Sequence, residues 1–363
     1  MTISSAERTQ LRTAVRELLD DACTEDDVRR VMATDDGFDR SLWRRLAEQG
    51  VAGMLVDDEY GGMGFSAREL EAVAEEIGAA LLPSPFLSSA VLTVALVQAA
   101  GADEDKRRLL PALADGTAIG TLAVTGPAGT WTEDGVDVRE SSGRLTGSAH
   151  YVTFGQVADV LLVVARTADG VGVFEVAGDA DGFARTAATV FDPTVRLSTF
   201  TFDDTPAKRI GTRGWDAVQE ALDLAVIGLA GEQVGGSRRM FDTTVDYLKT
   251  RVQFGRPIGS FQALKHMAAD LLIEVESATS AAQHAAAEHA DCGENAAGAI
   301  ALAGFACAEA YQTITMAAIQ MHGGIGFTWE HPAHLYARRA RTGVQLFGAP
   351  RLFRERYLTS KGA

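Results

Sequence analysis

The spacing of apolar residues changes twice along this chain of 363 residues, and each change marks a different kind of secondary structure. From Ser5 to about Gly116 apolar residues recur three and four positions apart, which predicts amphipathic helices. Residues 121–202 contain short β-rich runs between turn residues, and Ser142-Gly143 indicates a hairpin. From Gly214 onward the helical period returns in long segments, which predicts a helical bundle.

This order predicts an α+β protein with three domains, because the length suits two or three domains of about 150 residues each. We expect an N-terminal helical domain at residues 1–118, a middle antiparallel β domain at residues 119–208 and a C-terminal helical bundle at residues 209–363. No internal repeat is visible.

Composition excludes several classes of protein. The formal net charge of −16, from 49 acidic and 33 basic residues, disfavours nucleic acid and anionic membrane as partners. The three cysteines lie far apart without a disulfide or zinc-site spacing, so we expect reduced thiols and no metal site. The N-terminus is polar and no apolar run approaches about 20 residues, so we expect a cytoplasmic protein without a signal peptide or membrane span.

One string in the C-terminal half is specific. Residues 251–262 read RVQFGRPIGSFQ, which resembles the RxxFGxPIGxFQ signature of the acyl-CoA dehydrogenases. Further segments resemble the same family along nearly the whole chain: residues 43–50 (WRRLAEQG), 59–64 (EYGGMG), 110–116 (LPALADG) and 320–327 (QMHGGIGF).

The resemblance implies a flavoprotein with N-terminal helices, a middle β domain and a C-terminal four-helix bundle. Such enzymes oxidise the Cα–Cβ bond of an acyl-CoA thioester to a trans-2-enoyl-CoA and pass electrons from FAD to an electron-transferring flavoprotein. The chemistry needs a base for the α-proton and a flavin for the hydride, while the protein supplies positioning and electrostatics.

The resemblance also implies that FAD lies across a subunit interface, so that each site is made from two chains. The residues that reach the neighbouring subunit's FAD are all present, and their chemistry is suitable: a guanidinium for pyrophosphate, an aromatic ring beside a flat cofactor and glycines for close backbone approach. They are Arg251, Phe254, Gln262, Gln320, Gly323 and Gly324.

The half that a subunit offers to its own FAD is altered. Residues 125–131 read TGPAGTW where the family has TEPxAGSD, and residues 147–154 read GSAHYVTF where it has GxKxWITN. Thr153 keeps the threonine that contacts the flavin edge in relatives. The family's Lys and Asn have become Ala149 and Phe154.

Both positions at which the family keeps its catalytic glutamate are occupied by apolar residues. Counting from Gly323 places Phe347 at the glutamate of the YEGT segment, and counting back from Phe254 places Ala225 at the glutamate of the LDLE string. Glu232 is a weak substitute, because it lies about 10 Å along the helix axis from Ala225. We expect Glu232 to be a helix-surface or interface carboxylate.

Histidines offer no clear replacement for the base. Only His322 and His150 lie beside cofactor motifs, and we assign a catalytic role to neither.

Three functions remain open. The first is a subunit of a two-chain acyl-CoA dehydrogenase, of α2β2 type, whose homologous partner carries the catalytic glutamate; two-chain members act on bulky acyl-CoAs such as steroid side chains. The second is a self-sufficient homo-oligomeric dehydrogenase with an unidentified base. The third is a non-redox binding protein with the same fold, since a fold permits many functions.

Overall fold

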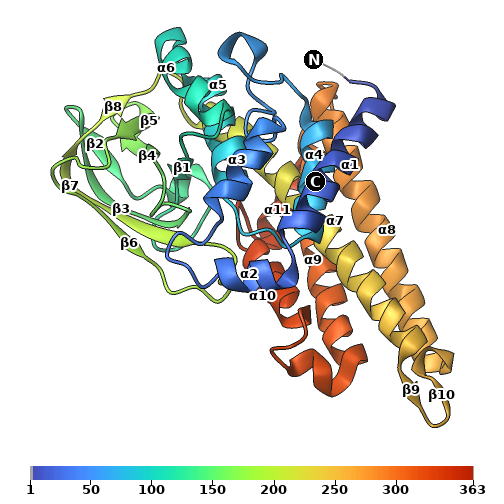
Figure 1. Cartoon of the computed structure of the whole chain (residues 1–363). Helices are drawn as coiled ribbons and strands as arrows, with labels where there is room; N and C mark the ends of the chain where they lie inside the picture. Colours follow the sequence, from blue (N-terminus) through green and yellow to red (C-terminus); the bar gives the residue numbers. More distant parts are fainter. Residues whose placement is uncertain (1–2, 363) are drawn as a thin grey trace. The chain divides into compact units, whose positions relative to one another are not determined.

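The computed structural model describes residues 3–362, and Figure 1 shows its ribbon. The chain divides into two compact units, which are described separately. Helices α2 (Glu25–Val31) and α7 (Trp215–Thr250) each contribute residues to both units. The first unit consists mainly of residues 29–66 and 83–225, and the second of residues 5–28, 67–82 and 226–363.

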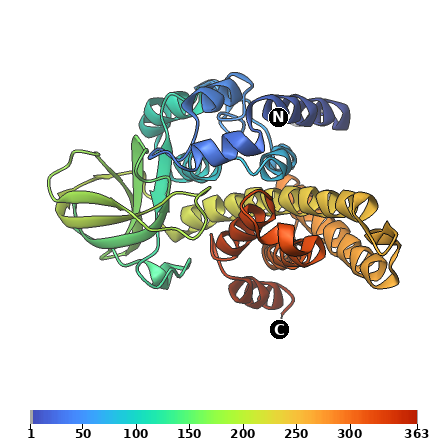
Figure 2. The same ribbon diagram turned by 60° about the horizontal axis from the view of Figure 1, so that its bottom comes forward.

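The first unit is built on one curved sheet (Figure 2). Its strand order is β6-β7-β3-β2-β4-β5-β8, with β1 beside β4. The inner strand β4 carries the continuous apolar run VLLVVA, and this run is fully buried, as expected for a strand covered on both faces. The strands are β1 Gly120–Ala123, β2 Arg139–Ser141, β3 Arg144–Thr153, β4 Val160–Thr167, β5 Gly170–Val176, β6 Phe183–Ala187, β7 Leu197–Pro206 and β8 Lys208–Arg209.

Strand pairing confirms the predicted hairpin and corrects one expectation. Ser142 and Gly143 have φ values of 54° and 75° between the antiparallel strands β2 and β3, as a two-residue hairpin turn requires. However, β1 and β2 each pair with β4 in parallel, so the sheet is mixed and not wholly antiparallel. Parallel neighbours need long crossover connections, and local turn signals do not reveal them.

One of the helical segments of the first unit packs on this sheet. The side chain of Asp39 caps α3 by accepting hydrogen bonds from the backbone N–H groups of Ser41 and Leu42. The π-helix η2 packs on β1, where the Gly120 N–H donates to Ser89 Oγ at 2.9 Å. These helical segments are α3 Arg40–Glu48, η1 Asp58–Tyr60, η2 Phe86–Thr93, α5 Val94–Ala100, α6 Asp103–Ala114 and η3 Glu133–Gly135.

The second unit is helical, which confirms the expected C-terminal bundle, and the N-terminal helices α1 and α4 belong to the same unit. Long helices α7 and α8 lie side by side, joined by the ion pair between Arg238 and Glu276 at 2.7 Å (Figures 1 and 2). No helix among residues 3–362 combines the length and apolar character that crossing a bilayer requires. The helices are α1 Ser5–Ala22, α4 Ala67–Ala79, α8 Gln262–Ala290, α9 Ala296–His322, η5 Gly323–Phe327, α10 Ala333–Gly343 and α11 Pro350–Ser360.

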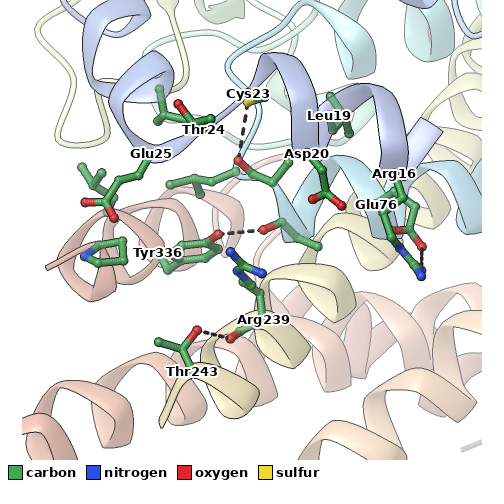
Figure 3. A pocket seen from close by; sticks show the side chains of 16 residues that line it. Arg16, Leu19, Asp20, Cys23, Thr24, Glu25, Glu76, Arg239, Thr243 and Tyr336 are labelled. Carbon is green, nitrogen blue, oxygen red and sulfur yellow. Dashed lines mark hydrogen bonds and ion pairs between the residues drawn. The ribbon is translucent and has the colours of Figure 1, made fainter. Parts of the chain in front are cut away.

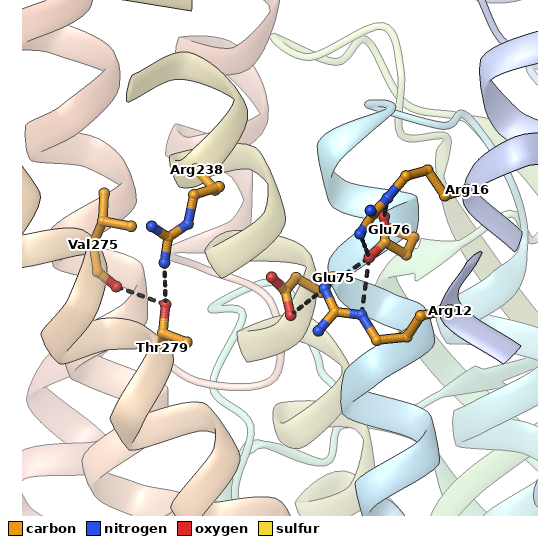
Figure 4. A network of polar contacts seen from close by, with 7 residues as sticks. All are labelled: Arg12, Arg16, Glu75, Glu76, Arg238, Val275 and Thr279. Carbon is orange, nitrogen blue, oxygen red and sulfur yellow. Dashed lines mark hydrogen bonds and ion pairs between the residues drawn. The ribbon is translucent and has the colours of Figure 1, made fainter. Parts of the chain in front are cut away.

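Arginines of α1 form ion pairs with carboxylates of α4 along their shared face. Arg12 contacts Glu75 at 3.0 Å and Glu76 at 2.7 Å, and Arg16 contacts the same Glu76 at 2.6 Å (Figure 4). The Glu76 carboxylate is 5% exposed, and hydrogen bonds from Arg16 and Arg12 outweigh its burial and lower its pKa. This shared carboxylate fixes α1 against α4.

Glycines bring α4 and α7 into backbone contact. A Cβ atom on Gly235 would lie 1.8 Å from the carbonyl oxygen of Glu75, and one on Gly78 would lie 2.0 Å from that of Glu232. Real Cβ atoms cannot approach so closely, so any side chain at these positions would push the two helices apart. The pair therefore depends on glycine for its close contact.

We expect the substitution Gly235→Ala to lower the free energy of unfolding by about 3 kcal/mol or more, because the added methyl group meets rigid backbone. Gly178 is a matched control, since a Cβ there would meet no atom within 4 Å. Gly178→Ala should change the free energy by less than about 1 kcal/mol. Urea unfolding measures both, and equal stability of the two variants would contradict this packing.

Candidate cofactor-binding site

The RxxFG residues form a hairpin that follows directly on α7. Strands β9 (Val252–Gln253) and β10 (Arg256–Pro257) pair antiparallel, and the turn residues Phe254 and Gly255 have φ values of 54° and 75°. A positive φ is uncommon for a phenylalanine and costs free energy. The strained turn leaves the Phe254 ring 91% exposed, with one edge-on neighbour, Phe261, at 6.0 Å between ring centroids. The ring is therefore available to a molecule outside this unit.

Arg251 supplies an exposed guanidinium at the base of this hairpin. Its backbone oxygen accepts a hydrogen bond from the Ile258 N–H at 2.8 Å, which anchors the hairpin. Its guanidinium makes no hydrogen bond or ion pair within the described part of the chain. The neighbouring Arg256 differs, because its guanidinium lies over the Phe261 ring at 4.1 Å. Arg251 can therefore bind an external oxyanion with two parallel N–H groups.

Two further predicted residues, Gln262 and Gln320, are also exposed. Gln262 is the first residue of α8, and Gln320 lies in the last turn of α9. Gly323 follows α9 with a φ of 65°, and a Cβ on Gly323 or Gly324 would meet no atom within 4 Å. The glycine backbone is therefore open to close approach by a ligand, and packing within this unit does not require glycine at either position.

His322 connects these glycines to α7. Its Nδ1–H donates to the Ala318 carbonyl at 2.7 Å, and its ring stacks on Tyr247 with centroids 4.6 Å apart. Burial lowers the pKa of His322, so the ring is neutral at neutral pH. The sequence singled out His322 because it lies beside a cofactor motif. Its role in anchoring the end of α9 is visible only in the structure.

The first unit holds the remaining predicted contact residue, Thr153, on β3, two positions after Tyr151. Tyr151 has a φ of 57°, remains 42% exposed, and donates from its hydroxyl to the Pro127 carbonyl at 3.3 Å. Thr153 is 6% exposed, and its carbonyl accepts a hydrogen bond from Thr121 Oγ1 at 2.6 Å. Tyr151 therefore packs on the loop that replaces TEPxAGSD, and Thr153 lies at the buried end of its strand.

The altered residues in the half of the site that a subunit offers to its own FAD are apolar or crowded. Ala149 and Phe154 are buried, and Phe154 packs edge-on against Phe38 with centroids 6.2 Å apart. A Cβ on Gly126 would lie 2.7 Å from Cβ of Asp137, so a glutamate at that position would clash. The first unit thus lacks the polar groups that relatives place here and has no space for one of them.

Neither position of the family's base carries a titratable group. Phe347 is 2% exposed with a φ of 59°, and Ala225 is completely buried in α7. Both are parts of the packed interior and cannot accept a proton.

The sequence left Glu232 as a helix-surface or interface carboxylate, and the structure buries it within the helical unit. It is 8% exposed and lies 3.3 Å from Nη1 of Arg339, which is buried as well. Arg339 also donates from Nη2 to the Leu82 carbonyl at 3.2 Å. Because a buried carboxylate without its cation is costly, Glu232 serves as the partner of Arg339. A carboxylate paired in this way is poorly suited to act as a substitute base.

A separate cavity of about 630 Å³ lies within the second unit (Figure 3). Its wall includes Arg239, Arg16 and Tyr336, whose hydroxyl donates to the Ala79 carbonyl at 2.7 Å. Burial raises the pKa of Tyr336 to about 12, so the phenol stays neutral. None of the predicted cofactor residues lines this cavity, and two of its polar side chains have partners within the unit: Tyr336 bonds the Ala79 carbonyl and Glu76 bonds Arg16.

The fold and these motifs agree with comparisons to known proteins. Residues 5–117 match the model of the N-terminal domain of acyl-CoA dehydrogenases, and residues 212–351 match that of the C-terminal domain. Acyl-CoA dehydrogenase IpdE2 of Mycobacterium tuberculosis is 37% identical over 350 residues, covering 95% of this chain and 94% of that protein. The chain belongs to the acyl-CoA dehydrogenase family.

Two solved structures are similar over nearly the whole chain. A chain of the ChsE4–ChsE5 complex from Mycobacterium tuberculosis superposes with a TM-score of 0.91 at 29% identity, covering 99% of this chain and 98% of that one. A chain of the Tcur3481–Tcur3483 steroid acyl-CoA dehydrogenase, in its G363A variant, gives a TM-score of 0.89 at 28% identity, with 98% of each chain covered.

We expect Glu232→Gln and Arg339→Met each to lower the free energy of unfolding by about 3 kcal/mol, because each leaves a buried charge unpaired. The double variant Glu232→Met/Arg339→Met should lose much less than the sum. The exposed pair Arg351–Glu355, 3.0 Å apart, is a matched control whose removal should cost less than about 1 kcal/mol. A double-mutant cycle by urea unfolding measures the coupling, and additive losses at Glu232 and Arg339 would contradict the pairing.

Proposed function

We propose that this chain is the base-lacking subunit of a heteromeric, FAD-dependent acyl-CoA dehydrogenase. The observation that carries the proposal is the burial of Phe347 and Ala225 at both positions where the family keeps its glutamate. The base then comes from a homologous partner chain, and the expected assembly is α2β2 in the cytoplasm. This chain alone is expected to be inactive.

The division of cofactor contacts between two chains supports the proposal. On the second unit, Arg251 and Phe254 are exposed and make few contacts within the chain. A Cβ atom on Gly323 or Gly324 would meet no atom within 4 Å, so a ligand can approach their backbone. On the first unit, the corresponding polar positions are filled by buried or crowded residues. Such a chain is suited to contribute to the FAD of its partner and poorly suited to hold an FAD of its own.

Each residue has a definite role in this arrangement. Arg251 would bind the pyrophosphate, Phe254 would pack against the cofactor, and the glycine backbone would lie against its ribose or phosphate. Gln262 and Gln320 would donate or accept hydrogen bonds at the same surface. Bound FAD supplies the hydride acceptor for Cβ of the substrate, and its electrons leave to an electron-transferring flavoprotein.

Relatives suggest the class of substrate and assembly. Similarity to a chain of the ChsE4–ChsE5 complex supports pairing with a second, homologous chain. Similarity to a steroid acyl-CoA dehydrogenase supports a bulky, steroid-type acyl-CoA that is converted to its trans-2-enoyl-CoA.

The test is to produce this chain alone and together with a homologous chain that carries the glutamate, and to measure acyl-CoA oxidation and FAD affinity. We expect activity only from the pair. Arg251→Ala in this chain should weaken FAD binding by the pair about tenfold or more, because a charge-assisted hydrogen-bond pair is lost. Arg351→Ala is the control, since Arg351 is an exposed arginine whose ion pair is with Glu355 in its own helix.

Two results would overturn the proposal. Strong oxidation of acyl-CoA by this chain alone would mean that an unidentified base exists and that the enzyme is self-sufficient. Absence of flavin from the chain in every combination would favour a non-redox binding protein. If the complex that contains the Arg251→Ala chain bound FAD as tightly as the wild-type complex, the hairpin would have no role in binding FAD.

A further inference from the structure

A second, smaller cavity lies in the helical unit, apart from every residue of the cofactor motifs. Its volume is about 320 Å³, at the lower end of the range for small-molecule sites. Residues of α1, α4 and α8 form its wall, and Arg68 lies in the first turn of α4. The charged and amide side chains of this wall are Arg8, Arg12, Arg68, Glu71 and Gln283.

Two arginines of α1 face this cavity with unused hydrogen-bond donors. Arg8 bonds only from Nε, to Glu69 Oε1 at 2.8 Å, so both of its terminal NH2 groups have no partner in the described part of the chain. Arg12 uses Nε and Nη2 for Glu76 and Glu75, which leaves its Nη1 group (Figure 4). A guanidinium carries five N–H donors in a fixed plane, so the unused N–H groups can bind a further anion.

Glu71 is the unusual member of the wall. It is 4% exposed, and its Oε1 atom is buried without a hydrogen-bond partner among the described residues. Its burial and the nearby Glu75 raise the pKa of Glu71 to about 8, against the opposing effect of Arg12 and Arg8. The carboxyl is therefore protonated at neutral pH and can donate through its O–H. A buried polar group without a partner is costly, and this one forms part of a cavity wall.

The surroundings of Glu71 select the charge of a ligand. Guanidinium groups at the cavity would repel a cation, and a protonated carboxyl offers a cation no compensating negative charge. An oxyanion could instead accept hydrogen bonds from the N–H groups of Arg8 and Arg12 and from the O–H of Glu71. The charged and titratable groups that face or surround Glu71 are Arg8, Arg12, Arg68, Glu75, Glu76 and the buried thiol of Cys307.

We propose that this cavity binds the oxyanion of a small metabolite, a phosphate ester or a carboxylate, with Arg8, Arg12 and Glu71 as its hydrogen-bonding groups. Gln283 adds an amide that can complete the set. No residue of the cofactor motifs lines this cavity, so the proposal can be tested separately from the proposed function.

Binding should depend on pH through Glu71. Below about pH 8 the carboxyl donates to the oxyanion. Above that value it ionises, loses its O–H and repels the ligand, so the affinity falls as pH rises. Arg68 is held by two bonds to Asp291, at 2.8 and 2.7 Å, and keeps its charge throughout.

The experiment is calorimetric titration of the full chain with sulfate and, separately, with acetate, at about pH 6.5 and about pH 9.5 and constant ionic strength. Sulfate stands for a tetrahedral phosphate ester and acetate for a planar carboxylate, and neither changes its charge over this range. We expect saturable binding of at least one probe at the lower pH, weakened at least about tenfold at the higher pH.

Matched variants separate this site from general charge effects. Glu71→Gln keeps a neutral donor of the same shape, so binding should persist and lose its pH dependence. Arg8→Ala should abolish binding, whereas Arg44→Ala, at an exposed arginine of α3, should leave it unchanged. Absence of saturable binding, equal affinity of the wild-type chain at both pH values, or full binding by Arg8→Ala would each overturn the proposal.

Discussion

The backbone contact between α4 and α7 is the constraint on which the helical unit depends. Gly78 and Gly235 remove side chains where the two helices would otherwise collide. Gly231 belongs to the same seam, since a Cβ there would lie 2.7 Å from the Glu71 carbonyl oxygen. Because the helices touch, the carboxyl groups of Glu71 and Glu232 are buried at or beside the seam and must find partners within the protein or in a ligand.

These two buried acids meet that requirement differently. Glu232 is paired with the buried Arg339, which also satisfies the Leu82 carbonyl. Glu71 has no such cation bonded to it, and its burial raises its pKa to about 8. One acid is paired with a buried guanidinium, and the other lies beside a cavity with a raised pKa. Neither arrangement gives a free carboxylate that could act as the base of a dehydrogenase.

The sequence predicted the succession of helices, strands and helices, the hairpin at Ser142-Gly143 and the absence of a glutamate at Phe347 and Ala225. Local spacing carries this information, because periodicity and turn residues act over a few positions. It did not predict the parallel partners of β4 or the Arg339 partner of Glu232, which lies 107 residues away along the chain. Helical spacing alone left Glu232 as a helix-surface or interface carboxylate, whereas the packing of α4 and α10 against α7 buries it. Contacts to FAD at Arg251, Gln262 and Thr153 stay predictions from the motif.

The central claim is that one chain supplies contacts to a cofactor that is held mainly by another chain. Counting the cofactors in the assembled complex tests it most directly, because a split site and two complete sites differ in stoichiometry. Native mass spectrometry of the purified complex with its glutamate-bearing partner should show one FAD for every two chains. One FAD per chain would contradict the account, since the crowded half around Gly126 and Phe154 would then be a working site.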